Sequence, residues 1–68
     1  MPEKWTGEVV GIMHNARITY TELAKELGVT KSYVGMVLNG HRAPEGAEEK
    51  FRSTLDRIIT ARQTDQAG

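Results

Sequence analysis

The chain has 68 residues with nine basic and nine acidic side chains, so its formal net charge at pH 7 is zero. A chain of this length forms one domain that buries only about 60% of its unfolded surface, which leaves no room for a typical enzyme pocket. The absence of cysteine excludes disulfides and thiolate metal sites, and no apolar run or signal peptide directs the chain to a membrane or out of the cell.

The first predicted helix covers residues 3–15, after a short arm. Five apolar residues recur in it at the spacings of one helical face, which we expect in the core: Trp5, Val9, Ile12, Met13 and Ala16. Gly7 and Gly11 lie within the same helix, where each costs up to about 1 kcal/mol relative to alanine. Close packing against another helix and fraying both remain open as explanations for these glycines.

The second predicted helix covers residues 20–27. Thr19 stands before it as N-cap and Glu22 follows three residues later, which is the spacing of a capping box. Gly28 directly follows the helix, at the position where a left-handed C-cap favours glycine. The apolar residues of this helix share one face: Leu23, Ala24 and Leu27.

The third predicted helix covers residues 31–39 and follows a turn of only three residues, Gly28-Val29-Thr30. Thr30 is its expected N-cap, and Asn39-Gly40 closes it. Three apolar residues point inward by their spacing: Val34, Val37 and Leu38. Two short helices joined by a tight turn that contains glycine are the signature of a helix-turn-helix.

The fourth predicted helix covers residues 44–62, with Pro44 at its first position, where the missing N–H is no loss. Its apolar stripe consists of Ala47, Phe51, Leu55, Ile58 and Ile59. Residues 63–68 contain one apolar side chain, Ala67, and are expected to form a disordered tail. The predicted fold is therefore an all-α compact bundle of four helices over residues 1–62, with a fifth helix left open.

The stretch from Tyr20 to Gly40, YTELAKELGVTKSYVGMVLNG, resembles the helix-turn-helix of lambda-repressor/Cro-like (XRE-type) DNA-binding domains. The matching positions are Ala24, Gly28, Val34, Val37 and the trailing Leu38-Asn39-Gly40. The resemblance covers about residues 5–60. It implies a sequence-specific regulator that binds double-stranded DNA, with a repressor of the small phage or mobile-element type favoured. We expect no enzyme activity, no cofactor and no small-molecule ligand, because the sequence has no cysteine, no clustered histidines and no phosphate-binding glycine loop.

The resemblance also assigns roles to residues of the third helix and its flanks. It places four residues at base edges: Lys31, Ser32, Gly35 and Met36. It places three at the DNA backbone: Tyr20, Tyr33 and Asn39. Four further residues are candidate phosphate contacts by their chemistry and position: Thr21, Thr30, His41 and Arg42. Gly35 either lets the helix sit deep in the groove or allows close packing between helices. Tyr33 could instead cover the first helix. Asn39 could be a C-cap.

The distribution of charge suits a nucleic-acid partner better than its sum does. No acid lies between Leu27 and Pro44, where Lys31, His41 and Arg42 form a locally basic stretch. Because one such unit buries little surface, we expect dimers on half-sites about 34 Å apart. The candidate dimer surface is Leu55, Ile58 and Ile59, although these residues could instead belong wholly to the core.

Two functions from different classes remain in competition. The neutral net charge also suits a protein-interaction module of the antitoxin or antirepressor kind, which would use the same fold without strong DNA binding. In either case we expect a cytoplasmic protein, associated with the nucleoid of a bacterial or phage-infected cell if it binds DNA.

Overall fold

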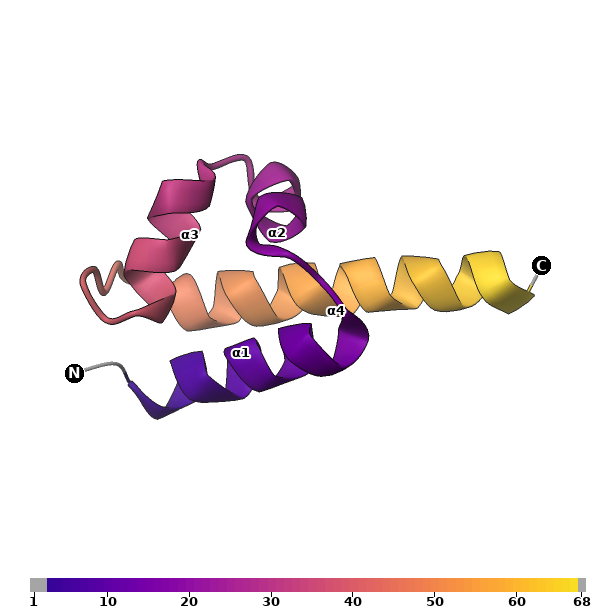
Figure 1. Cartoon of the computed structure of the whole chain (residues 1–68), viewed down its shortest axis with the longest axis horizontal. Helices are drawn as coiled ribbons and strands as arrows, with labels where there is room; N and C mark the ends of the chain where they lie inside the picture. The colour runs from indigo at the N-terminus through magenta and orange to yellow at the C-terminus, as the bar shows by residue number, and fades with distance from the viewer. Residues whose placement is uncertain (1–2, 68) are drawn as a thin grey trace.

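The computed structural model describes residues 3–67, and it describes side chains for residues 3–63. Its helices are α1 (Lys4–Ala16), α2 (Tyr20–Leu27), α3 (Lys31–Leu38) and α4 (Ala47–Ala67). The described residues contain four helices and no strand, so the all-α class is confirmed and the fifth helix is not found there. α1 lies along α4, and the α2–α3 pair sits over both (Figure 1).

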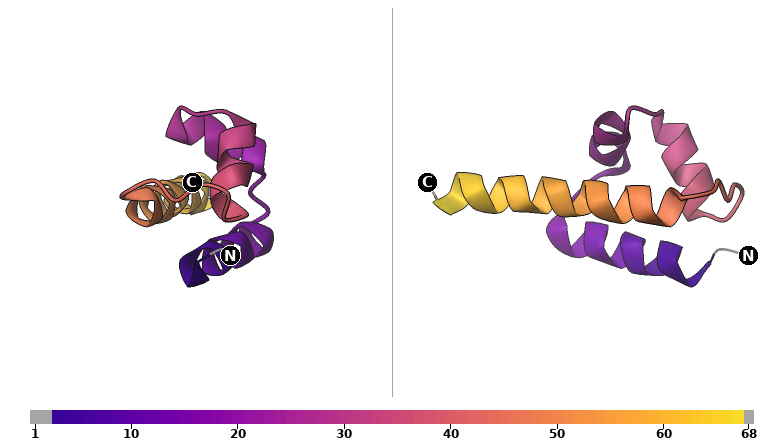
Figure 2. Two further views of the ribbon diagram at one scale, coloured as in Figure 1. Left: turned by 90° about the vertical axis from the view of Figure 1, so that its left-hand side faces the viewer. Right: turned by 180° about the vertical axis from the view of Figure 1, so that it is seen from behind.

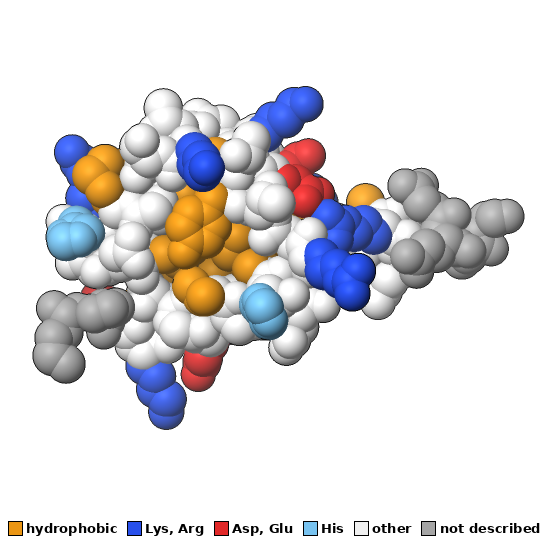
Figure 3. All heavy atoms as spheres, viewed as in Figure 1, with side chains coloured by type: hydrophobic (Ala, Val, Ile, Leu, Met, Phe, Trp, Pro, Cys, Tyr) orange, Lys and Arg blue, Asp and Glu red, His pale blue; other side chains and the backbone are white. Residues whose placement is uncertain are grey.

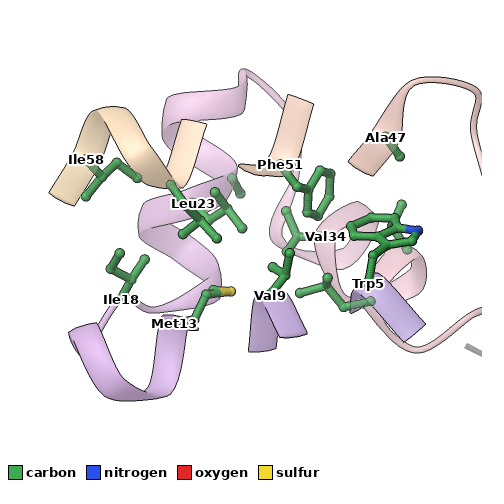
Figure 4. Close-up of a cluster of buried hydrophobic side chains, with 13 residues drawn as sticks. Trp5, Val9, Met13, Ile18, Leu23, Val34, Ala47, Phe51 and Ile58 are labelled. Atoms are coloured by element: carbon green, nitrogen blue, oxygen red, sulfur yellow. The ribbon is translucent and has the colours of Figure 1, made fainter. Parts of the chain in front are cut away.

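All four helices contribute to one core (Figure 4). Leu23, Val34 and Val37 are at most 1% exposed, which confirms the predicted inward faces of α2 and α3. The Trp5 and Phe51 rings meet edge to face, with centroids 5.7 Å apart and planes at 79°. The Trp5 indole N–H donates to the Glu3 carboxylate at 2.7 Å, so this buried ring keeps a partner for its polar edge.

α1 differs from its prediction at one core position. Ile12 is 36% exposed, whereas Thr6 is buried and its hydroxyl donates to the Glu3 carbonyl at 2.6 Å. The buried arc is centred on Val9 and Met13, and Ile12 lies at its edge. The local hydrogen bond removes the cost of burying a hydroxyl, so the buried arc of α1 extends to Thr6 on one edge and leaves Ile12 exposed on the other.

The caps of the helix-turn-helix agree with the prediction, apart from one side chain. The Thr19 hydroxyl accepts the N–H of Glu22 and the Thr30 hydroxyl accepts the N–H of Tyr33, both at 3.0 Å. Gly28 adopts the left-handed conformation, with φ of 76°. The Glu22 carboxylate, however, is held by the Arg62 guanidinium at 2.7 and 2.9 Å, so the predicted capping box is only half formed.

α4 begins and ends later than predicted. Residues 44–46 form a turn in which the Ala47 N–H donates to the Pro44 carbonyl at 3.2 Å. Gly46 has a φ of 77°, a left-handed conformation that cannot continue into a helix, so α4 starts at Ala47 rather than at Pro44. The helix then runs past residue 62 to Ala67, because extending an existing helix adds a backbone hydrogen bond for each residue fixed. The predicted tail is therefore helical as far as Ala67, and residue 68 lies outside the described residues.

The other helix bounds differ from the prediction by at most one residue. α1 covers 4–16 instead of 3–15, and α3 ends at Leu38 with Asn39 as its C-cap. Within residues 3–67, no helix combines the length and the hydropathy needed to cross a membrane.

Three arginines of α4 hold acids of the other helices. Arg52 pairs with Glu8 of α1 and, within α4, with Glu48 at 2.9 Å, and the hydrogen bonds that Arg52 donates to these two carboxylates raise its pKa. Arg57 reaches Glu26 of α2, at 3.9 Å between Nη2 and Oε2. Arg62 holds Glu22 and also donates to the carbonyl of Ala16 at 2.5 Å, so it ties α4 to the end of α1 as well as to α2.

Candidate nucleic-acid interface

The start of α2 and the middle of α3 meet on one side of the molecule. A Cβ added to Gly35 would lie 3.9 Å from Cε2 of Tyr20, the first residue of α2. The views in Figures 1 and 2 place the linker 17–19, the first turn of α2 and α3 on this side, with α4 on the other. We call this side the α2–α3 face. Candidate residues from two helices are thus brought onto one surface.

The residues expected at base edges lie on the solvent side of α3. Lys31 and Ser32 are exposed in its first turn, while Gly35 and Met36 are half-buried one turn later. The opposite side of the helix is anchored by three buried residues: Val34, Val37 and Leu38. The solvent side of α3 therefore has polar side chains in its first turn, no side chain at Gly35, and a flexible apolar side chain at Met36.

Gly35 is not required by packing inside the domain. The 3.9 Å separation from the Tyr20 ring is an ordinary van der Waals contact, so an alanine side chain would fit there without any shift. A glycine in a helix interior costs about 1 kcal/mol relative to alanine. Close packing between helices therefore does not explain Gly35. Two explanations remain: the helix tolerates the glycine, or a molecule outside the domain approaches the helix backbone at this point.

The residues expected at the DNA backbone divide into two groups. Most are exposed: Thr21, Thr30, Asn39, His41 and Arg42. Tyr20 and Tyr33 are half-buried and pack against the core, while the contact of Tyr33 with the first helix stays a prediction. Asn39 is the C-cap of α3, with its backbone N–H donating to the Gly35 carbonyl at 2.9 Å.

The loop after α3 folds back onto the end of that helix. The backbone N–H groups of His41 and Arg42 both donate to the Met36 carbonyl, at 2.8 and 3.2 Å. These bonds fix the loop backbone beside the α3 residue that is expected nearest to a thymine methyl. His41 and Arg42 are thus held beside the last turn of α3 by the Met36 carbonyl.

Ion pairing gives the α2–α3 face a more basic character than the neutral chain suggests. Glu22 and Glu26 are the acids of residues 18–43, and both are bound to arginines of α4. Lys25, Lys31 and Arg42 have no acidic partner within the described side chains. Figure 3 shows this side of the molecule, with Lys, Arg and His side chains around an apolar hollow and acidic side chains visible among them.

Sequence reasoning did not identify Arg62 as a partner of this region. Its carboxylate partner, Glu22, lies 40 residues away in the chain. The only sequence signal was the spacing of five residues between Arg52, Arg57 and Arg62, which is not a regular helical repeat. Three-dimensional packing was needed to show that these arginines neutralise the acids of the helix-turn-helix.

The candidate dimer surface on α4 is largely inside the domain. Leu55 and Ile58 are 2% and 7% exposed, so the core uses them. Ile59 is half-buried and lines a shallow groove of about 470 Å³ between α1 and α4, together with the exposed Ile12. Of the three residues, only Ile59 remains accessible to a second copy of the chain.

Comparison with known proteins gives one match. A family model described as helix-turn-helix matches residues 15–48, which are 34 of the 68 residues. The matched segment runs from the end of α1 through α2 and α3 to the first turn of α4. No curated protein and no solved structure matches the chain.

Proposed function

The chain belongs to the lambda-repressor/Cro-like (XRE-type) helix-turn-helix family of DNA-binding regulators, and we propose that it is a sequence-specific repressor that inserts α3 into the major groove. The observation that carries this proposal is the two-sided character of α3. Buried valines anchor one side, and the side with Lys31 and Ser32 faces solvent. A major groove about 12 Å wide admits one such helix.

The first turn of α3 supplies the groups best suited to base recognition. In the proposed complex, the Lys31 ammonium donates to O6 or N7 of a guanine, and the Ser32 hydroxyl bonds a neighbouring base. Met36, one turn later, contacts a thymine methyl, while Gly35 lets the helix backbone approach the base edges. The polar side chains that contact bases thus lie at the N-terminal end of α3, and the apolar side chain that contacts a base lies one turn further along the helix.

Residues around α3 then position it on the duplex. The start of α2, with Tyr20 and Thr21, faces one sugar–phosphate strand, and His41 and Arg42 face the other edge of the groove. Phosphate contacts of this kind fix register and supply affinity but carry no sequence information. Repression follows from occupancy, because a protein bound at an operator blocks the polymerase.

A second copy of the chain would double the contacts and create a two-fold symmetric site, with half-sites about 34 Å apart. We propose that the accessible part of α4, at Ile59, contributes to that dimer. The size of the protein–DNA complex by sedimentation tests this point separately from DNA binding itself.

Selection of bound fragments from a random duplex pool tests the proposed function. We expect one enriched sequence, and we expect its affinity to fall steeply between 50 and 200 mM salt as counterions are released. If no sequence is enriched and binding to DNA is weak at both salt concentrations, the DNA-binding proposal is refuted. The neutral net charge then favours the second function, a protein-interaction module of the antitoxin or antirepressor kind.

A further inference from the structure

Arg17 holds a backbone conformation that normally selects glycine. Its φ is 57°, and it is the one non-glycine residue with positive φ among the described residues. It ends α1, with its N–H donating to the His14 carbonyl at 3.2 Å and the N–H of Ile18 donating to the Met13 carbonyl at 2.9 Å. This is the Schellman pattern, in which the left-handed residue is usually glycine because a Cβ is strained there.

Elsewhere among the described residues, glycine occupies the left-handed positions. The other left-handed positions in the described residues are occupied by Gly28, Gly40 and Gly46. A glycine at position 17 would end α1 by the same two hydrogen bonds with less strain. Folding stability alone therefore does not explain the arginine, and its side chain must be considered.

The Arg17 side chain is exposed and, within the described residues, has no acidic or hydrogen-bonding partner. This distinguishes it from the arginines of α4, each of which is bonded to a carboxylate inside the domain. An arginine guanidinium without a partner has five N–H donors in a planar fork that matches the geometry of a phosphate group.

The position of Arg17 suits such a ligand. It begins the linker 17–19, which lies on the α2–α3 face (Figures 1 and 2). It is three residues before Tyr20, whose ring lies against Gly35 in the middle of α3. A duplex that accepts α3 in its groove would therefore extend its backbone toward the end of α1.

We infer that Arg17 is a further phosphate-binding residue, which extends the DNA contact from α3 across the linker to the end of α1. The inference rests on the proposed DNA-binding function. The strained conformation is retained because it places a cation on the DNA-facing side at a point where the chain reverses direction.

The Arg17→Gly variant tests this inference, because it changes folding and binding in opposite directions. We expect its melting temperature to rise by about 4–8 °C, since the left-handed strain is relieved in a domain of this size. We expect its affinity for the selected duplex to fall about tenfold, and the slope of log K against log salt to decrease in magnitude by about 0.9, the value for one phosphate contact. Arg17→Lys keeps the charge and should keep the slope. Lys50→Ala removes an exposed cation on α4 and should change neither affinity nor slope.

The outcomes separate this inference from the proposed function. If the wild-type chain binds the selected duplex and Arg17→Gly binds it with unchanged affinity and slope, the inference is overturned while the DNA-binding function stands. An equal loss with Lys50→Ala would also overturn it, because the effect would then be one of net charge. If the wild-type chain does not bind DNA, the proposed function itself fails, whatever the variant does to the melting temperature.

Discussion

Replacing Gly35 by alanine should stabilise the protein and weaken its binding to DNA. Gly35 lies inside α3, where a glycine costs about 1 kcal/mol relative to alanine. The added methyl group would meet the Tyr20 ring at 3.9 Å, an ordinary contact, so no packing strain offsets the gain in helix stability. In a domain of 68 residues, about 1 kcal/mol raises the melting temperature by about 4–8 °C.

The loss of DNA binding follows from the close approach proposed for α3. A methyl group forced into a well-packed contact costs about 1–3 kcal/mol, which corresponds to about a 5-fold to 150-fold loss of affinity. The assay is titration of the selected duplex at fixed salt, beside a thermal melt of the free protein. Gly11→Ala is the matched control, because Gly11 also lies inside a helix and an added Cβ would meet nothing within 4 Å.

We expect Gly11→Ala to gain similar stability and to bind DNA as the wild type does. If Gly35→Ala binds the duplex as tightly as Gly11→Ala does, α3 does not sit deep in the groove at this point. If Gly35→Ala melts below the wild type, the described contact between Tyr20 and α3 is incorrect.

Three further predictions concern α2, α3 and α4. Lys31→Ala should weaken binding to the selected site by about 1–3 kcal/mol and relax the preference at one base pair; an equal loss on all sequences would make Lys31 a phosphate contact instead. Leu23→Ala removes a fully buried side chain and should cost about 2–5 kcal/mol of a total of a few kcal/mol, measured by urea unfolding; an unchanged midpoint would contradict the described core. Arg62→Met should cost about 1–2 kcal/mol, because the Ala16 carbonyl and the partly exposed Glu22 carboxylate lose their donor. In the Arg62→Met, Glu22→Gln double mutant the two losses should not add, and simple additivity would exclude the coupling.

The sequence predicted those parts of the fold that depend on local interactions. Thr19 and Thr30 cap helices because a hydroxyl at that position reaches an N–H three residues on, and Gly28 ends α2 because it has no Cβ. Such interactions involve residues within one turn of each other. The bounds of α2 were therefore predicted without error.

Other features depended on residues far apart in the chain. Glu22 has the spacing of a capping box, but a full positive charge from Arg62 competes with a single backbone N–H for its carboxylate and holds it. The apolar stripe of α4 could not be divided between core and surface by spacing, because only the packing of α1 and α2 on α4 shows that Leu55 and Ile58 are covered.

The sequence predicted which residues of α3 face solvent, but it did not predict that the acids near the candidate site are paired with arginines. The exposed positions of Lys31 and Ser32 follow from the inward spacing of the valines in α3. The neutralisation of Glu22 and Glu26 by α4 could not be predicted, nor could the conformation of Arg17, since αL geometry at a non-glycine residue has no signal in the sequence.

The pairing of the helix-turn-helix acids with α4 has a consequence for how the protein meets its target. Within the described side chains, Lys25 of α2 and Lys31 of α3 have no acidic partner, and Glu45, Glu49 and Asp56 on the segment that leads into and along α4 have no arginine partner. A molecule with zero net charge and separated signs has an electric moment, and the field of a polyanion exerts a torque on it rather than a pull. If the protein binds DNA as proposed, this torque orients the α2–α3 face toward the duplex before contact. The protein lacks the long-range attraction that holds strongly basic proteins on DNA of any sequence.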